Sequence, residues 1–504
     1  MTFPRASGVL LHVSSLPNSP AIGDLGLAAE QFIDWLASAG QRYWQILPLG
    51  PTGYGDSPYA CLSAFAGNPF LISLDRLVAD GLLPDQSFDE LEGEEPGRVD
   101  FGKVVSVKKN LIEAAYRHFL VHGTAAQHAD FAAFCATEAR WLDDFALFLA
   151  IKKEQELKGW WDWPKELRLR YPEALQSATE RLADGIGLVQ FEQWVFFRQW
   201  QRILNYAHER GIQVIGDLPI FVARDSAETW AKPHLFYFDD EARPIYQAGV
   251  PPDYFSATGQ LWGNPLYRWD KMAEEGYAWW IDRCKALLDM VDIIRIDHFR
   301  GFDEYWEVAG DAQTAEHGRW VKGPGTALFE AIQNALGRLP IMAEDLGFMT
   351  QGVIDLRDHF AFPGMHILQF AWSMDIGAKS EAELYPYLPH LYKTNSVAYT
   401  GTHDNNTSLG WWEEDASDAE RQKACEYMGI DGSYFVWELI RQTFACPSDT
   451  AVVPMQDLLG LGAAFRMNYP GRAQGNWQWR ATADAFSDEL AAALKEITAQ
   501  THRM

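Results

Sequence analysis

Cysteine is scarce in this chain of 504 residues. The five cysteines, Cys61, Cys135, Cys284, Cys425 and Cys446, are widely spaced and form no Cys-x-x-Cys pair. Such spacing argues against a zinc knuckle or a disulfide framework and fits a reducing compartment. The N-terminal segment lacks the pattern of a signal peptide, and no apolar run approaches the roughly 18 residues of a membrane span. We therefore expect a cytoplasmic protein that does not enter a membrane.

Basic residues are also few. The chain has 42 lysines and arginines against 69 acidic residues, a net charge of −27. Proteins that bind nucleic acids or anionic membranes usually carry a basic face, and no dense run of lysine and arginine occurs here. We expect no nucleic-acid partner, and a substrate that is neutral or cationic.

Aromatic residues, in contrast, are abundant. Aromatics make up 14% of the chain, with 21 tryptophans, and 48% of all residues are apolar. This composition excludes general disorder. The tryptophans are typical of a large core. The alternative is a long groove of flat rings on which the apolar faces of sugars stack.

Eight short, nearly apolar runs have the character of strands buried on both faces. They are residues 8–13, 43–49, 212–217, 291–297, 339–344, 365–370, 396–400 and 451–455. Helical patterns lie between many of them, and one at residues 27–39 is followed by Gly40 as a cap. Although the length alone would allow about three domains, this alternation predicts an α/β protein whose residues 1–504 form one (β/α)8 TIM barrel.

Two gaps between these strands are too long for simple barrel connections. Residues 74–187 have mostly helical patterns, so we expect a large helical insertion subdomain after the second strand. Residues 218–266 are rich in Pro, Gly and aromatics and follow the third strand. Long loops are often functional, and we expect this loop-rich insertion to cover the active face.

Carboxylates stand where the predicted strands end. Asp217, Asp297 and Glu344 end strands three, four and five, and Asp404 follows strand seven. Barrel enzymes place their chemistry at this rim. Such a gathering points to a metal site or to acid–base and nucleophilic work. The sequence has no DxDxDG pattern, and its single HxxxH pattern, at residues 118–122, lies in the segment 74–187 and not at the end of a predicted strand. We expect no metal and no cofactor. Two further carboxylates, Asp345 and Asp457, are interpreted as helix caps.

Arg295 distinguishes the two central carboxylates. It stands two residues before Asp297, on the same side of a strand, where its charge would keep Asp297 ionised. Glu344 has Met342 in the corresponding place, a less polar setting that would raise its pKa. This division of labour is that of retaining glycosidases, whose two carboxyls lie about 5–5.5 Å apart.

Three motifs make the sequence recognisable: RIDHFRG at 295–301, AEDLG at 343–347 and GTHDNN at 401–406. With supporting segments such as 12–17, 249–256 and 466–471, the chain resembles the amylomaltases, 4-α-glucanotransferases of the α-amylase clan. The resemblance covers nearly the whole chain. It implies an enzyme that transfers part of an α-1,4-glucan to the 4-OH of glucose or of another glucan, by a retaining double displacement.

The resemblance also implies roles for individual residues. Asp297 matches the family's nucleophile, Glu344 its acid/base and Asp404 its third carboxylate. Side chains that match sugar contacts at the cleavage point are Tyr59, Asp217, Arg295, His403 and Asn468. Side chains that match a loop closing over the glucan are Asp253, Tyr254, Phe255 and Trp262.

Further expectations follow from the same resemblance. The donors are maltodextrins and other α-1,4-glucans, with glucose as an acceptor. The chain leaves no room for the C-terminal β-domain of α-amylases, and we expect a monomer, with a homodimer as the alternative. Two other functions stay open: a hydrolase of the same clan, and a non-catalytic glucan-binding protein.

Overall fold

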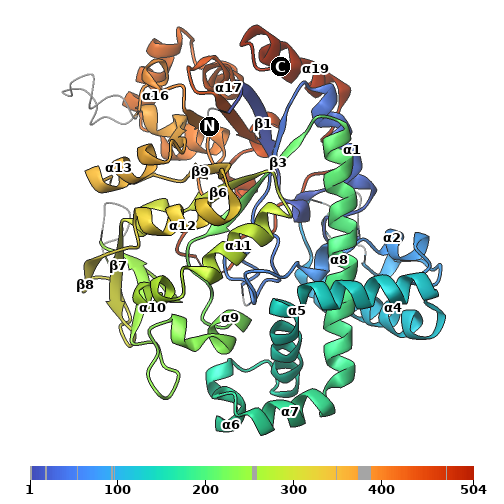
Figure 1. Ribbon diagram of the computed structural model, residues 1–504. Coiled ribbons are helices and arrows are strands. Elements are labelled where there is room, and N and C mark those ends of the chain that lie inside the picture. Colours follow the sequence, from blue (N-terminus) through green and yellow to red (C-terminus); the bar gives the residue numbers. More distant parts are fainter. Residues whose placement is uncertain are drawn as a thin grey trace.

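Eight short parallel strands form a barrel at the centre of the molecule (Figure 1). The computed structural model describes residues 3–17, 20–53, 55–91, 95, 97–252, 258–347, 349–372, 387–472 and 474–504. The barrel strands are β1 (Ala6–Leu10), β2 (Tyr43–Gln45), β3 (Gln213–Pro219), β6 (Ile293–Asp297), β9 (Ile341–Ala343), β10 (Gly364–Ile367), β11 (Ser396–Tyr399) and β12 (Thr450–Pro454). They are ordered β10-β11-β12-β1-β2-β3-β6-β9. A hydrogen bond from Ala343 N–H to Pro363 O (2.9 Å) links β9 to the start of β10, so the barrel is nearly closed.

All eight predicted barrel strands are confirmed, although several end earlier than predicted. β2 was expected to reach residue 49 and ends at Gln45. The chain stays buried beyond that point, since Leu47 is as enclosed as the strand itself. An apolar run reports burial rather than ladder pairing, so it extends past the end of the strand.

Helices cover the outside of the barrel. They include α1 (Leu27–Ser38), α11 (Ala278–Leu288), α12 (Thr326–Leu336), α13 (Gln351–His359), α16 (Asp418–Met428), α17 (Phe435–Ala445) and α19 (Asp488–Gln500), with the shorter α10 (Trp269–Glu274), α15 (Ser408–Gly410) and α18 (Met455–Leu458). Gly40 follows α1 with a φ of 70°, a left-handed conformation that suits glycine and turns the chain toward β2.

The long connection between β2 and β3 is mostly helical, as predicted. It contains α2 (Leu74–Ala79), α3 (Phe101–Lys103), α4 (Lys109–His122), α5 (Ala125–Glu154), α6 (Lys165–Arg168), α7 (Pro172–Arg181) and α8 (Ala183–Glu209). The long helix α8 packs on α5 and also reaches α1 at the barrel (Figure 1). One continuous helix therefore joins this insertion to the barrel.

A second sheet differs from the expected loop-rich insertion. Strands β4 (Tyr246–Val250), β5 (Gln260–Pro265), β7 (Glu304–Ala309) and β8 (Gly318–Lys322) form an antiparallel sheet in the order β5-β4-β7-β8. The described residues of the segment expected to be loop-rich thus contain two strands and the helix α9 (Ala227–Ala231). The sheet escaped prediction because β4 pairs with β7, a strand that lies beyond β6 in the chain.

No helix in the described part of the chain is both long and apolar enough to span a membrane.

Candidate active site

Four carboxylates from different strands stand at one end of the barrel. Asp217 lies in β3 and Asp297 is the last residue of β6. Glu344 directly follows β9, and Asp404 lies in the loop after β11. These are the carboxyl ends of parallel strands, so the carboxylates share one rim, as predicted.

A buried arginine joins two of these carboxylates. Arg295 is paired with Asp217 across β6 and β3, so both side chains point to the same side of the barrel wall. Arg295 Nη1 donates to Asp217 Oδ1 (2.8 Å), to Asp217 Oδ2 (2.7 Å) and to Asp297 Oδ1 (3.1 Å). Tyr59 completes the group, because its hydroxyl donates to Asp217 Oδ2 (2.7 Å).

Glu344 is held against the residue that follows Asp297. His298 has a left-handed backbone with φ 53°, which lets its N–H donate to Glu344 Oε2 at 2.7 Å. The Leu346 N–H donates to Glu344 Oε1 at 2.9 Å. In the backbone, Glu344 N–H donates to Ile296 O and Phe299 N–H donates to Glu344 O. These bonds fix the Glu344 carboxylate relative to the end of β6.

Burial dominates the protonation of both central carboxylates. It raises the pKa of Glu344, as expected for a general acid. It also raises the pKa of Asp297 together with the nearby Asp217, Glu344 and Asp404, and Arg295 only opposes this. The expectation that Arg295 would decide the state of Asp297 is therefore wrong in part, because the guanidinium is shared with Asp217. The two carboxyls together hold on to a proton more tightly than free carboxyls do.

The loops after β11 and β12 contribute further side chains to the site. Asn468 Nδ2 donates to Asp404 Oδ1 at 2.6 Å, and its backbone N–H donates to His403 O at 3.1 Å. His403 Nε2 lies 3.3 Å from Asp404 Oδ1. The His403 ring stacks on Tyr59, with ring centroids 5.2 Å apart and planes at 12°. The structure thus brings together Asp217 of β3, Arg295 and Asp297 of β6, His403 and Asp404 of the loop after β11, and Asn468 of the loop after β12.

Trp262 of β5 lies at the edge of the same site. Its ring meets that of His298 edge to face, at 4.8 Å between centroids, and 37% of its surface is exposed. The other predicted loop residues, Asp253, Tyr254 and Phe255, lie outside the described residues.

Asp345 and Asp457 have structural partners but are not helix N-caps: Asp345 stands before α13 without capping it, and Asp457 lies inside α18. Asp345 accepts hydrogen bonds from Arg357 Nη1 and from the Met365 N–H. Asp457 accepts from the hydroxyls of Thr400 and Ser408. Thr350 and Pro454 occupy the cap positions of α13 and α18. The helix-cap interpretation was therefore wrong, and both carboxylates instead tie neighbouring barrel elements together.

Two arginines near the site were missed in the sequence analysis. Arg466 Nη2 donates to the backbone O of Asp404. Arg283 of α11 donates to Pro219 O (2.6 Å) and Ile220 O (3.1 Å), at the end of the strand that carries Asp217. Arg283 stands in a helix pattern, and nothing in that pattern reveals which carbonyls its side chain reaches.

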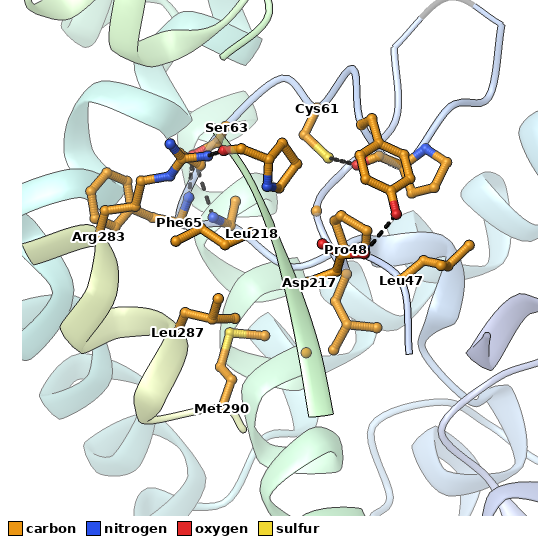
Figure 2. A pocket seen from close by; sticks show the side chains of 18 of the residues that line it. Leu47, Pro48, Cys61, Ser63, Phe65, Asp217, Leu218, Arg283, Leu287 and Met290 are labelled. Carbon is orange, nitrogen blue, oxygen red and sulfur yellow. Dashed lines mark hydrogen bonds between the residues drawn. The ribbon is translucent and has the colours of Figure 1, made fainter. Parts of the chain in front are cut away.

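A pocket of about 70 Å³ lies between β3 and α11, and Asp217 and Tyr59 of the candidate site are among the residues that line it. Figure 2 shows Leu218 near its centre, with Arg283, Leu287 and Met290 on the α11 side. Its walls are mainly apolar, and of the four carboxylates at the rim only Asp217 lines it, whereas Asp297, Glu344 and Asp404 do not. We therefore place the chemistry at the carboxylate rim and not in this pocket.

The fold and the site together define a barrel enzyme of the α-amylase clan. A family model described as 4-alpha-glucanotransferase matches residues 11–485. The chain belongs to this family, the amylomaltases of glycoside hydrolase family 77, and its activity is that of a 4-α-glucanotransferase on α-1,4-glucans.

Individual relatives cover almost the entire chain. The 4-alpha-glucanotransferase of Synechocystis is 48% identical over 98% of this chain and 97% of its own. That of Thermus thermophilus is 46% identical over the full length of both. Among solved structures, the amylomaltase of Streptococcus agalactiae in complex with acarbose is 39% identical, with a TM-score of 0.94 and 99% coverage of both chains.

Proposed function

We propose that this enzyme transfers a segment of an α-1,4-glucan to the 4-OH of glucose or of another glucan by a retaining double displacement. The observation that carries the proposal is the pairing of two differently held carboxylates. Asp297 is bonded to the Arg295 guanidinium, and Glu344 is held by the N–H of the next residue, His298. One carboxylate beside a cation and one that retains a proton are what this mechanism requires.

In the first half-reaction, Asp297 attacks C1 of the glucose unit at the cleavage point. The bond between C1 and the bridging oxygen breaks, and Glu344 gives its proton to that oxygen. A β-linked glycosyl-enzyme forms, and the shorter glucan leaves. The raised pKa of Glu344 supports its role as the proton donor.

In the second half-reaction, the 4-OH of an acceptor attacks C1 and its proton passes to Glu344. The bond between C1 and Asp297 breaks, so two inversions give net retention. The expected spacing of about 5–5.5 Å between the two carboxyls stays a prediction of this mechanism.

The remaining predicted residues would bind the sugar. Asp404 and His403, held by Asn468, present oxygen and nitrogen atoms to sugar hydroxyls. Tyr59 offers a ring face on which a sugar can stack. Asp217 and Arg295, which are hydrogen-bonded to each other, hold their side chains in place beside Asp297. The exposed Trp262 is a candidate to close over the glucan with Asp253, Tyr254 and Phe255. A sugar acceptor that these side chains bind and position can attack the glycosyl-enzyme before water does.

The products from maltotriose test this proposal against hydrolysis. Transfer yields glucose and a ladder of longer maltodextrins, and total reducing ends stay nearly constant because each broken bond is remade. Thin-layer chromatography and a reducing-sugar assay measure both quantities. Rising reducing ends without any product longer than maltotriose would identify a hydrolase and overturn the proposed transfer.

A further inference from the structure

A small cavity borders His403, and neither Tyr59 nor any of the four carboxylates at the rim is among the residues that line it. It has a volume of about 20 Å³, and its walls include His12, His403 and Asn406. Since about 10–15 Å³ is enough for one water molecule, the cavity can hold a single water if polar partners surround it.

Three polar atoms of the side chains in these walls lack a hydrogen-bond partner that a water molecule could supply. Within the described residues, His12 Nδ1, His403 Nδ1 and Asn406 Oδ1 have no hydrogen bond from the protein. The side chains are buried, with His12 9%, His403 6% and Asn406 7% exposed. Other polar groups of the wall are already bonded: Ser15 donates to Trp479 O, and Thr402 donates to Asn405 Oδ1. Leaving three buried polar atoms unpaired is unfavourable, so the cavity is polar as well as large enough.

The chemistry of the three atoms assigns donors and acceptors. His403 Nε2 faces Asp404 Oδ1 at 3.3 Å, and a carboxylate only accepts, so Nε2 carries the hydrogen and Nδ1 is an acceptor. Asn406 Nδ2 donates to Asp415 Oδ2 at 2.9 Å, which leaves its Oδ1 as a second acceptor. Burial lowers the pKa of His12 to about 3, so His12 is neutral and can carry its hydrogen on Nδ1.

We propose that one water molecule in this cavity accepts a hydrogen bond from His12 Nδ1–H and donates to His403 Nδ1 and Asn406 Oδ1. His12 is then a positioning residue, because the water keeps His403 in the tautomer that bears hydrogen on Nε2. That hydrogen is the one directed at Asp404 and at a sugar hydroxyl. The inference relies on the proposed function only for the contact between His403 and the sugar.

Two substitutions of His12 separate positioning from packing. His12→Leu keeps an apolar filler and removes the donor, whereas His12→Asn puts an amide N–H near the place of Nδ1. We expect His12→Leu to lower kcat/KM for maltotriose disproportionation about 10- to 100-fold and His12→Asn to remain within about threefold of the wild type. Matched thermal unfolding midpoints of the two variants serve as the control for folding.

The tautomer of His403 is measured directly by 15N NMR of histidine-labelled protein. Its signals are assigned by their loss in His403→Gln. The wild type and His12→Asn are expected to show hydrogen on Nε2, and His12→Leu a mixture of tautomers. Hydrogen on Nδ1 in the wild type, or an unchanged tautomer in His12→Leu, would overturn the inference, and the wild-type spectrum decides even if His12→Leu does not fold. Because the spectrum needs no substrate, failure of this inference is distinct from failure of the proposed transfer.

Discussion

Arg295 is the one cation in direct contact with the central carboxylates among the described residues. Its Nη1 is shared between Asp217 and Asp297, and Glu344 and Asp404 add further negative charge nearby. Burial and these charges raise the pKa of Asp297 above its value in the unfolded chain. Such a group binds more protons in the folded state, so its contribution to stability is present at low pH and lost as the pH rises.

Asp297→Asn should therefore make the folded protein more stable at neutral pH. The amide keeps an oxygen for Arg295 and removes the charge, so we expect the free energy of unfolding at pH 7.5 to rise by about 0.5–2 kcal/mol. Near pH 4, where the folded-state carboxyl of the wild type is protonated, the difference should shrink. Urea unfolding of both proteins at the two pH values measures it. A variant less stable than the wild type at pH 7.5 would show that the site carries no such strain.

Glu344→Gln tests the proton donor. Because burial raises the pKa of Glu344, the wild-type kcat/KM should fall as the pH rises through that pKa. Glu344→Gln should lower kcat for maltotriose about 10²- to 10⁴-fold, the usual contribution of a general acid–base. The rate of its first turnover with an α-glycosyl fluoride, measured as released fluoride, should fall much less, because that leaving group needs no proton. Glu413→Gln, at an exposed position in the helical turn Trp411–Asp415, is the matched control. An equal loss with both substrates would contradict the role of Glu344.

The antiparallel sheet contributes an aromatic side chain to the site from outside the barrel. Trp262 of β5 contacts His298, the residue after Asp297. Trp320 of β8 belongs to the same sheet and is equally exposed at 37%, but its ring lies against the Arg300 guanidinium, 3.9 Å from the ring centroid. The two tryptophans are therefore matched in sheet and in exposure, but only Trp262 contacts a residue of the site.

Trp262→Ala should raise KM for maltodextrins and increase the share of hydrolysis. Loss of ring stacking is worth about 1–3 kcal/mol in comparable stacked contacts, or roughly 5- to 150-fold in affinity. Trp320→Ala should leave the ratio of transfer to hydrolysis unchanged. The ratio is obtained from released reducing ends and total glucose transferred. If both variants change it equally, the sheet acts through its stability and not through Trp262.

The sequence predicted the barrel more completely than the sheet beside it. The strands of the barrel are buried on both faces, so each stands out as an apolar run without knowledge of its partners. β8 is mostly exposed, and Gly249 of β4 faces Trp306 of β7 without a side chain of its own. Neither pattern identifies a strand, because the sheet is defined by pairing between distant segments.

The same distinction holds in the site. Asp217, Asp297 and Glu344 were found because the end of a barrel strand is a position that sequence pattern reveals. The contacts of Arg283 with Pro219 and of His12 with the cavity that borders His403 depend on how whole elements pack. Those contacts became visible only when α11 and the segment after β1 were placed against the barrel.

The complete barrel brings four carboxylates from distant parts of the chain to one rim, and the account assigns the covalent step to Asp297. Glu344→Gln treated with α-maltotriosyl fluoride tests that assignment most directly. The fluoride leaves without an acid, and the variant lacks the base that would activate an acceptor, so a glycosyl-enzyme should accumulate. Intact-protein mass spectrometry should show one added maltotriosyl group, and peptide mapping should locate it on Asp297. An adduct on another residue, or turnover without any adduct in rapidly quenched samples, would contradict the account.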